Sequence, residues 1–239
     1  MTHLANQVAV VTGANSGIGK AIVFALAAHG AAVCLVGRRM EALQPVAQQA
    51  LNGSVCYRAD LGLESDIAAL VANLKQDVNG IDILVHSAGV IRLSSFECAS
   101  PEQLDWHYKV NVRAPYLLTQ GLLPMIKARQ GQIVFVNSTA GLHAGANTSQ
   151  YASTKHALKA VADSLREEVN AAGVRVLSLF LGRTASPMQA SVHEMERRKY
   201  NPELLMQPED VAAVVVNTLT LPRTAEVTEV SMRPCVKSY

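Results

Sequence analysis

Apolar segments of strand length alternate with longer amphipathic segments along almost the whole of this 239-residue sequence. The apolar runs favour strands at residues 7–12, 32–37, 54–59, 81–86, 132–137, 174–180 and 226–232. Between them, apolar residues recur with helical spacing near 17–29, 40–50, 64–78, 101–128, 151–172 and 208–220. Largely apolar strands that alternate with helices are typical of a parallel sheet covered by helices on both faces.

Right-handed crossovers between such strands give a doubly wound α/β fold of the Rossmann type, here with about seven strands. No linker, repeat or low-complexity segment divides the sequence, so we expect a single domain over residues 1–239. Residues 182–207 are too many for an ordinary connection between a strand and a helix. We expect this segment to form a loop or helix that covers the substrate, with the charges at 197–199 on a solvated face.

Composition argues against several other classes of protein. Hydrophobic residues make up 49% and charged residues 17% of the chain, which suits a large buried core. A formal net charge of +2 gives no reason to expect a nucleic-acid or membrane partner. Cys34, Cys56, Cys98 and Cys235 have no metal-ligand spacing, so we expect no metal site. Unpaired cysteines, and the lack of a signal-like or membrane-spanning segment, predict a cytoplasmic protein.

A glycine-rich turn follows the first predicted strand and opens the first predicted helix. It contains Gly13, Asn15, Ser16, Gly17, Ile18 and Gly19. Glycines in such a turn let the backbone bend tightly and approach a pyrophosphate closely. The N-terminus of the helix adds free N–H groups and a favourable dipole for that anion. We therefore predict that these residues bind a dinucleotide.

Two arginines, Arg38 and Arg39, follow the second predicted strand, about 20 residues beyond the glycine turn. Sites that select NAD usually place Asp or Glu here to bind the ribose 2′-hydroxyl, whereas arginine suits a 2′-phosphate. The sequence therefore predicts NADP(H) in preference to NAD(H), with Arg38 and Arg39 as the residues that bind the phosphate. The alternative is a pair of solvated arginines that simply opens the next helix.

Tyr151 and Lys155 lie four residues apart in a predicted helix, and therefore on one face of it. A nearby cation favours the phenolate, so we expect Lys155 to lower the pKa of Tyr151 towards the range in which acid–base catalysis is efficient. Ser138 stands at the carboxyl end of a predicted strand, the edge where ligands bind in doubly wound sheets. These three residues predict hydride chemistry on a carbonyl or an alcohol beside the dinucleotide.

In the order and spacing of these motifs, the chain resembles the short-chain dehydrogenases/reductases (SDRs) over nearly its whole length. The resemblance rests on Thr12-Gly-x-x-x-Gly17-x-Gly19, Asp60, Asn111 and the set Ser138, Tyr151 and Lys155. It implies that Tyr151 exchanges a proton with the substrate oxygen, that Ser138 polarises this oxygen, and that Lys155 also binds the nicotinamide ribose. It further implies that Asn111 holds a water molecule in a proton relay to Lys155.

The resemblance also implies further contacts with the cofactor. They come from Asp60, Leu61, Ser87, Ala88, Gly89, Gly182, Thr184 and Ser186. Asp60 would contact the adenine ring, or could instead cap the following helix, whereas Thr184 and Ser186 would bind the nicotinamide carboxamide. The sequence departs from the family pattern at two positions. His86 replaces a structural asparagine, where contact with the ribose and simple packing are both open, and Leu181 replaces a proline.

The resemblance implies an NADP(H)-dependent oxidoreductase that transfers a hydride between the nicotinamide and a carbonyl or secondary alcohol. Such an enzyme would act as a ketone or aldehyde reductase or as an alcohol dehydrogenase. The alternatives are a reductase of 3-oxoacyl thioesters, an isomerase or dehydratase that retains its cofactor, and a non-catalytic NADP-binding regulator. The C-terminal sequence lacks the Val-Asp-Gly-Gly ending common in the thioester reductases, which favours the carbonyl reductase or alcohol dehydrogenase.

Three segments, residues 90–96, 142–147 and 182–206, are expected to form the substrate pocket. They offer Ile91, Leu93, Leu142, His143, Asn147, Met188, Val192 and Met195. A mainly apolar pocket with a few orienting groups favours an uncharged ketone, aldehyde or 3-oxo ester. The resemblance also predicts a homodimer or homotetramer paired through helices 101–128 and 151–172, unless their apolar residues only face the sheet.

Overall fold

The computed structural model describes residues 3–50 and 52–236. Within them the strands are β1 (Val8–Thr12), β2 (Ala32–Gly37), β3 (Val55–Arg58), β4 (Ile83–His86), β5 (Gln132–Ser138), β6 (Arg175–Leu181) and β7 (Glu229–Met232). They form one sheet in the order β3-β2-β1-β4-β5-β6-β7, in which every neighbouring pair is parallel. The predicted doubly wound, Rossmann-like sheet in a single domain is confirmed. Its strand order reverses between β1 and β4, where such sheets bind ligands.

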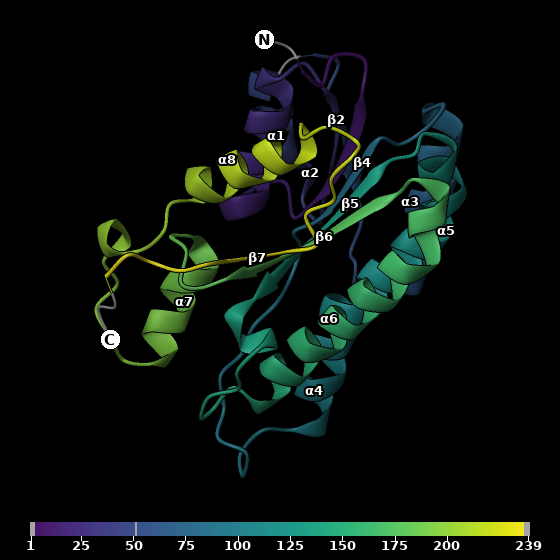
Figure 1. The fold of residues 1–239 in the computed structure, drawn as a ribbon. Helices are drawn as coiled ribbons and strands as arrows, with labels where there is room; N and C mark the ends of the chain where they lie inside the picture. Colours follow the sequence, from purple (N-terminus) through teal and green to yellow (C-terminus); the bar gives the residue numbers. More distant parts are fainter. Residues whose placement is uncertain (1–2, 51, 237–239) are drawn as a thin grey trace.

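Helices cover both faces of the sheet (Figure 1). One face packs against α1 (Gly17–Ala28), α2 (Met40–Ala50) and α8 (Pro208–Leu219), and the other against α3 (Glu64–Asp77), α5 (Ala114–Ala128) and α6 (Ser149–Val169). The remaining α-helices are α4 (Pro101–Tyr108) and α7 (Pro187–Met195). The predicted helix 101–128 is interrupted by a π-helical segment, Lys109–Arg113, between α4 and α5. Segments of this kind are frequent at functional sites.

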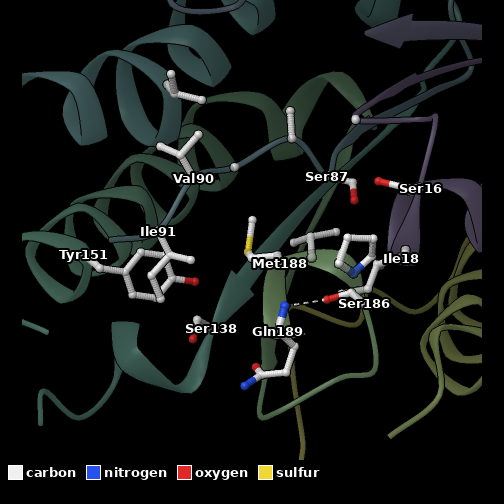
Figure 2. Close-up of a pocket in the computed structure, with 18 of the residues that line it drawn as sticks. Ser16, Ile18, Ser87, Val90, Ile91, Ser138, Tyr151, Ser186, Met188 and Gln189 are labelled. Carbon is white, nitrogen blue, oxygen red and sulfur yellow. Dashed lines mark hydrogen bonds between the residues drawn. The ribbon is translucent and has the colours of Figure 1, made fainter. Parts of the chain in front are cut away.

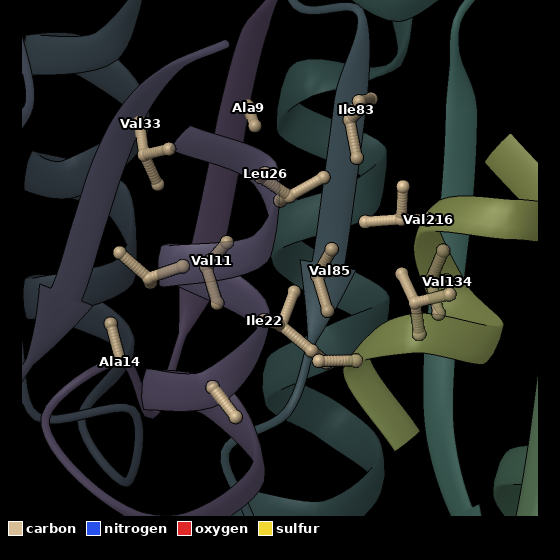
Figure 3. Close-up of a cluster of buried hydrophobic side chains, with 14 of the residues drawn as sticks. Ala9, Val11, Ala14, Ile22, Leu26, Val33, Ile83, Val85, Val134 and Val216 are labelled. Atoms are coloured by element: carbon tan, nitrogen blue, oxygen red, sulfur yellow. The ribbon is translucent and has the colours of Figure 1, made fainter. Parts of the chain in front are cut away.

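Alternating side chains of the strands fill two cores, because successive residues of a strand point to opposite faces of the sheet. In β1, Ala9 and Val11 pack with Ile22 of α1 and Val216 of α8, as Figure 3 shows. Val10, between them in sequence, belongs to the cluster on the other face. The near-continuous apolar run that predicted this strand therefore reflects burial on both faces of the sheet.

The segment predicted to cover the substrate contains α7. Ser186 is its N-cap and accepts a hydrogen bond from the Gln189 N–H at 3.1 Å. Pro187 begins the helix, at a position where the N–H that proline lacks would have no partner within the helix.

No helix among the described residues is long and apolar enough to cross a membrane. The same residues contain no cluster of His, Cys, Asp and Glu that could hold a metal ion, and all four cysteines are free thiols.

Candidate active site

A continuous cavity of about 770 Å³ runs along the carboxyl edge of the sheet, from the glycine turn to Tyr151. Every predicted cofactor-binding residue lines it: Gly13, Asn15, Ser16, Gly17, Ile18, Gly19, Arg38, Arg39, Asp60, Leu61, Ser87, Ala88, Gly89, Tyr151, Lys155, Gly182, Thr184 and Ser186. Of the remaining predicted catalytic residues, Ser138 lines the cavity and Asn111 does not. The segments that follow β1, β2, β3, β4 and β6, together with the end of β5 and the start of α6, thus bring these residues into one space.

The glycine turn fits a pyrophosphate because its backbone leaves no room for side chains. Gly13 has a φ of +66°, and a Cβ placed on it would lie 2.9 Å from the Ala88 Cα. A Cβ on Gly19 would overlap the carbonyl oxygen of Gly13. Ser16 is the N-cap of α1 but makes no capping hydrogen bond with its side chain, and the first turn carries no acidic residue. The hydroxyl and the N-terminal N–H groups of α1 are therefore available to an anion.

Arg38 and Arg39 are exposed at the end of β2 and face the same cavity. Within the part of the chain that the structure describes, neither forms an ion pair with a carboxylate. A phosphate at this point would therefore meet two guanidinium groups without a carboxylate partner, and each guanidinium has the fork of N–H donors that can bind a phosphate in a bidentate manner.

Asp60 stabilises its own loop and does not cap α3. Its Oδ1 accepts the Gly62 N–H at 2.9 Å, and its backbone N–H donates to Asp66 Oδ2 at 2.9 Å. The N-cap of α3 is Leu63, so the alternative prediction of a capping role is wrong. The Asp60 carboxylate accepts the N–H of Gly62 and not an N–H of α3, because the chain makes one further turn before the helix begins at Glu64. Both Asp60 and Leu61 line the cavity, and contact of Asp60 with an adenine ring stays a prediction.

Ser138 and Tyr151 meet at the other end of the cavity (Figure 2). Ser138 ends β5 and its Oγ accepts the Ala140 N–H at 3.1 Å. Tyr151 lies in the first turn of α6, with its hydroxyl pointing into the cavity between Ile91 and Ser138. Lys155, one turn later and only 5% exposed, donates from Nζ to the carbonyl oxygen of Val136 at 3.2 Å. All three residues thus line the cavity, and the hydroxyl of Tyr151 points into it.

The pKa of Tyr151 shifts opposite to the expected direction. Burial raises it, because the phenolate would lose its hydration, and a hydrogen bond with the Ser138 side chain lowers it by less. Burial also lowers the pKa of Lys155 to about 8. The spacing of the two residues in sequence indicated that a cation lies nearby, but it carried no information about burial, and burial has the larger effect on both groups.

Asn111 lies in the π-helical segment and is 1% exposed. Its Oδ1 accepts the Val90 N–H at 2.8 Å, and its Nδ2 donates to the Val90 carbonyl oxygen at 2.9 Å and to Thr154 Oγ1 at 3.1 Å. A Cβ on Gly89 would lie 3.4 Å from Asn111 Oδ1 and 3.9 Å from Lys155 Nζ. The side chain therefore fixes the segment after β4 next to Lys155, and the water relay implied by the resemblance stays a prediction.

Thr184 and Ser186 lie between β6 and α7. The Thr184 hydroxyl donates to the Gly182 carbonyl oxygen at 3.2 Å, and the residue is buried. The Ser186 N–H donates to the Tyr200 hydroxyl at 3.1 Å. Tyr200 thus holds the backbone of this loop from the side away from the cavity, while the Ser186 side chain faces into it (Figure 2).

His86 is a packed histidine. It is 3% exposed, its ring stacks on Phe135 with centroids 4.9 Å apart, and its Nε2 lies 2.8 Å from Thr119 Oγ1. The cavity-lining residues do not include it. Of the two alternatives left open by the sequence, contact with the ribose is therefore excluded in favour of packing. Burial lowers its pKa to about 3, so the imidazole is neutral.

The substrate end of the cavity matches the predicted walls only in part. Ile91, Leu93, Met188 and Val192 line it, whereas Leu142, His143, Asn147 and Met195 do not. The wall predicted at 142–147 is wrong, because the short 3₁₀ helix Thr139–Gly141 turns the chain and leaves Thr139, Ala140 and Thr148 at the cavity.

Trp106 lies outside the three predicted wall segments, yet it also lines the cavity. Arg183, Gln189 and Glu196 line it from the predicted segment 182–206, although the sequence did not single them out. Arg183 and Glu196 form a bidentate ion pair, with NH1–Oε2 at 2.8 Å and NH2–Oε1 at 2.7 Å. Trp106 precedes Asn111 by five residues, and this closeness to a predicted site residue was the available signal. Nothing in the sequence signals a pair that depends on how α7 folds back on the end of β6.

Comparisons with known proteins agree with this geometry. The family model described as short chain dehydrogenase matches residues 7–197. An uncharacterized oxidoreductase of Staphylococcus epidermidis is 34% identical over 235 residues, which cover 98% of this chain and 100% of the relative.

Solved structures show the same fold. A metagenomic short-chain oxidoreductase in complex with NADP is 30% identical, with a TM-score of 0.84, and 98% of this chain and 100% of that one are covered. The 3-ketoacyl-(acyl-carrier-protein) reductase of Brucella melitensis, complexed with NADH, is 27% identical, with a TM-score of 0.85 and coverage of 95% and 98%. The match of the family model, the full-length relatives and the arrangement of the cavity show that this chain belongs to the short-chain dehydrogenase/reductase family of oxidoreductases.

Proposed function

We propose that this protein is an NADP(H)-dependent reductase of ketones or aldehydes that also catalyses the reverse oxidation of secondary alcohols. One observation carries the proposal. The hydroxyl of Tyr151 points into the same cavity that contains the glycine turn and the two arginines after β2. A proton donor and a dinucleotide cradle in one continuous space are the requirement for reducing a carbonyl.

The bound nicotinamide would supply the hydride in reduction or accept it in oxidation. Tyr151 gives its proton to the substrate oxygen in reduction, and its raised pKa keeps the phenol protonated for this step. Ser138 hydrogen-bonds to the same oxygen and stabilises the charge that develops on it. In this proposal Lys155, buried one turn from Tyr151, binds the ribose hydroxyls, and Asn111 keeps the neighbouring segment in position through its hydrogen bonds to Val90.

The preference for NADP(H) over NAD(H) rests on Arg38 and Arg39. Both face the cavity, and an acidic residue that would repel a 2′-phosphate is absent from this point of the sequence. Relatives of similar fold were solved with either cofactor, with NADP in the metagenomic enzyme and NADH in the Brucella enzyme. The choice therefore depends on this chain's own arginines, and not on the fold.

The substrate is proposed to be an uncharged, largely apolar carbonyl compound. Ile91, Leu93, Trp106, Met188 and Val192 give apolar surface to the cavity that Tyr151 also lines. The positive charge of Arg183, which lines the same cavity, is balanced by Glu196. Such a lining favours a neutral ketone, aldehyde or 3-oxo ester over a phosphorylated substrate.

The test is a screen for NADPH oxidation with ketones, aldehydes, ethyl acetoacetate and acetoacetyl-CoA, comparing the wild type with Tyr151→Phe. We expect turnover of neutral ketones that Tyr151→Phe loses, while the exposed α5 control Tyr116→Phe keeps it. Turnover of the thioester alone would identify a 3-oxoacyl-thioester reductase. Tight NADPH binding without any turnover would favour a regulator, and product without net consumption of NADPH would favour an isomerase or dehydratase.

We also propose a homodimer or homotetramer that acts in the cytoplasm. Leu104, Trp106, Tyr108 and Tyr116 expose large apolar side chains on α4, at its end and on α5. A second copy of the chain would remove this surface from water. Light scattering at micromolar concentration tests the assembly, with a monomer contradicting it, and cell fractionation tests the location.

A further inference from the structure

One wall of the substrate pocket has no secondary structure of its own. Residues 87–100, between β4 and α4, form neither helix nor strand, yet Ile91 and Leu93 from this segment line the cavity. Backbone N–H groups near the protein interior need partners, and an irregular segment must find them outside itself. The groups that receive its hydrogen bonds therefore decide where the two apolar side chains stand.

The backbone of this wall is held at every second residue. The bonds run from Ala88 N to Thr12 Oγ1 (3.1 Å), Val90 N to Asn111 Oδ1 (2.8 Å), Arg92 N to His107 Nε2 (2.9 Å) and Ser94 N to the Asn147 carbonyl oxygen (3.0 Å). Ile91 and Leu93 lie between consecutive bonded residues and face the cavity, while the Arg92 side chain between them is exposed. Alternate N–H groups of this segment thus donate hydrogen bonds as in an edge strand, but most of the acceptors are side-chain atoms and not a neighbouring strand.

His107 is buried at 0% exposure beneath this wall. Its Nδ1 lies 2.7 Å from the Gln103 carbonyl oxygen, which can only accept a hydrogen bond. Its Nε2 receives the Arg92 N–H, which can only donate. The imidazole must therefore be neutral and carry its proton on Nδ1. Burial lowers the pKa of His107, which keeps this form at neutral pH.

His107 and Asn111 stand one helical turn apart, so both project towards the wall from the same side of their helix. Asn111 forms two hydrogen bonds with the backbone of Val90, and His107 forms one with the backbone of Arg92. Ile91 is therefore fixed on both sides, and Leu93 directly follows the His107 bond. The geometry points to His107 as a positioning residue: its hydrogen bond to Arg92 N–H holds Ile91 and Leu93 in the place that sets substrate affinity. This inference rests on the proposed function for the identity of the bound molecule.

Two polar substitutions separate this role from general packing. In His107→Gln, the side-chain oxygen can reach the position of Nε2 and accept the Arg92 N–H. In His107→Asn, the shorter amide can reach only the Gln103 carbonyl oxygen, so Arg92 N–H loses its acceptor. Ile126→Val, in a buried position of α5 outside the cavity, serves as the control for a modest loss of stability.

The first readout is hydrogen–deuterium exchange in peptides that cover residues 88–96, which needs no turnover. We expect His107→Asn to accelerate exchange there roughly tenfold, the loss of about one hydrogen bond. We expect His107→Gln and Ile126→Val to match the wild type. Exchange in the glycine turn should be the same in all four proteins. Unchanged exchange at 88–96 in His107→Asn overturns the inference.

The second readout is the affinity for ethyl acetoacetate, measured as KM and also by the fluorescence of Trp106, the single tryptophan of the chain. His107→Asn should raise KM several-fold and leave kcat and the KM for NADPH unchanged, while His107→Gln restores the wild-type KM. Faster exchange with an unchanged KM and unchanged fluorescence titration overturns the positioning role. If the wild type turns over none of the carbonyl compounds, the proposed function fails, and the exchange data still decide whether His107 holds the wall.

Discussion

The ammonium of Lys155 lies over the ring of Tyr151, with Nζ 5.7 Å from the ring centroid, and it hydrogen-bonds to the carbonyl oxygen of Val136. The positive charge thus faces the aromatic face of the tyrosine, while Ser138 is the partner of the hydroxyl. Because burial then dominates the titration of Tyr151, the phenol is held in its protonated form. This arrangement suits a proton donor better than a base.

The direction of catalysis should therefore depend on pH. Reduction uses the protonated phenol, which predominates near neutrality because the pKa of Tyr151 is raised above its ordinary value. Oxidation needs the phenolate, whose fraction grows as the pH rises. We expect kcat/KM for ketone reduction to stay nearly flat from about pH 6 to 8, and that for alcohol oxidation to rise by up to about tenfold per pH unit. A flat oxidation profile over this range would contradict the raised pKa.

Arg38→Asp should change the choice of cofactor. Removing a guanidinium and adding a carboxylate should raise the KM for NADPH by roughly 10- to 100-fold, the cost of a lost charge-assisted hydrogen bond. The KM for NADH should change little, because its ribose carries no phosphate. Steady-state kinetics with both cofactors measure the ratio. Arg58→Asp, an exposed arginine at the end of β3 outside the cavity, should leave the ratio unchanged. An unaltered ratio in both Arg38→Asp and Arg39→Asp would remove the argument for NADP(H).

Glu196→Gln should change the response to substrate charge. The substitution removes a negative charge from the cavity wall and leaves the positive Arg183 in place. Acetoacetate should then gain about 1 kcal/mol of attraction, roughly fivefold in KM, relative to ethyl acetoacetate. The ratio of the two KM values is the measurement, and it should shrink at high salt. An equal change for both substrates would mean that α7 had moved and that charge was not the cause.

His86 should make the protein sensitive to acid. Its pKa is about 3 in the folded state against 6.5 for an ordinary histidine, so the unfolded chain binds a proton that the folded chain refuses. As the pH falls from about 6.5 towards 3, the free energy of unfolding should decline by up to about 1.4 kcal/mol per pH unit from this group. Urea unfolding at several pH values measures the slope.

His86→Asn should be less stable at neutral pH, because it loses the stacking on Phe135, but its stability should depend less on pH. His156→Asn provides the matched control, since this histidine is exposed on α6. Its pH dependence should equal that of the wild type. Identical slopes in all three proteins would show that His86 does not carry the effect.

Much of the fold followed from the sequence because its causes are local. The apolar runs located all seven strands to within three residues at either end, and Gly13 and Gly19 marked the turn where side chains do not fit. The position of Lys155 beside Tyr151 followed from spacing, since i and i+4 share a helical face, whereas Ser138 followed from its place at the end of a strand. The strands could be predicted from apolar runs because the sheet is buried on both faces.

The features that the sequence did not show depend on contacts between distant segments. Asn111 lies in the π-helical segment Lys109–Arg113 and bonds to Val90 without itself lining the cavity, and no propensity marks such a segment. The ion pair of Arg183 with Glu196 requires α7 to return to β6. The pKa of Tyr151 requires the completed packing around it. Asn111 and Tyr151 were identifiable from the sequence, but their surroundings were not, and nothing in the sequence singled out Arg183 or Glu196.

The wall over the substrate has a consequence for how such a protein can change. Its main chain is fastened by Thr12, Asn111 and His107, none of which belongs to the segment itself. The hydrogen bonds that hold the segment therefore do not involve the side chains of Ile91 and Leu93. Mutation at these two positions can change the shape of the pocket while the backbone of the segment and the proton donor Tyr151 stay in place. They are natural starting points for directed evolution of a new substrate range.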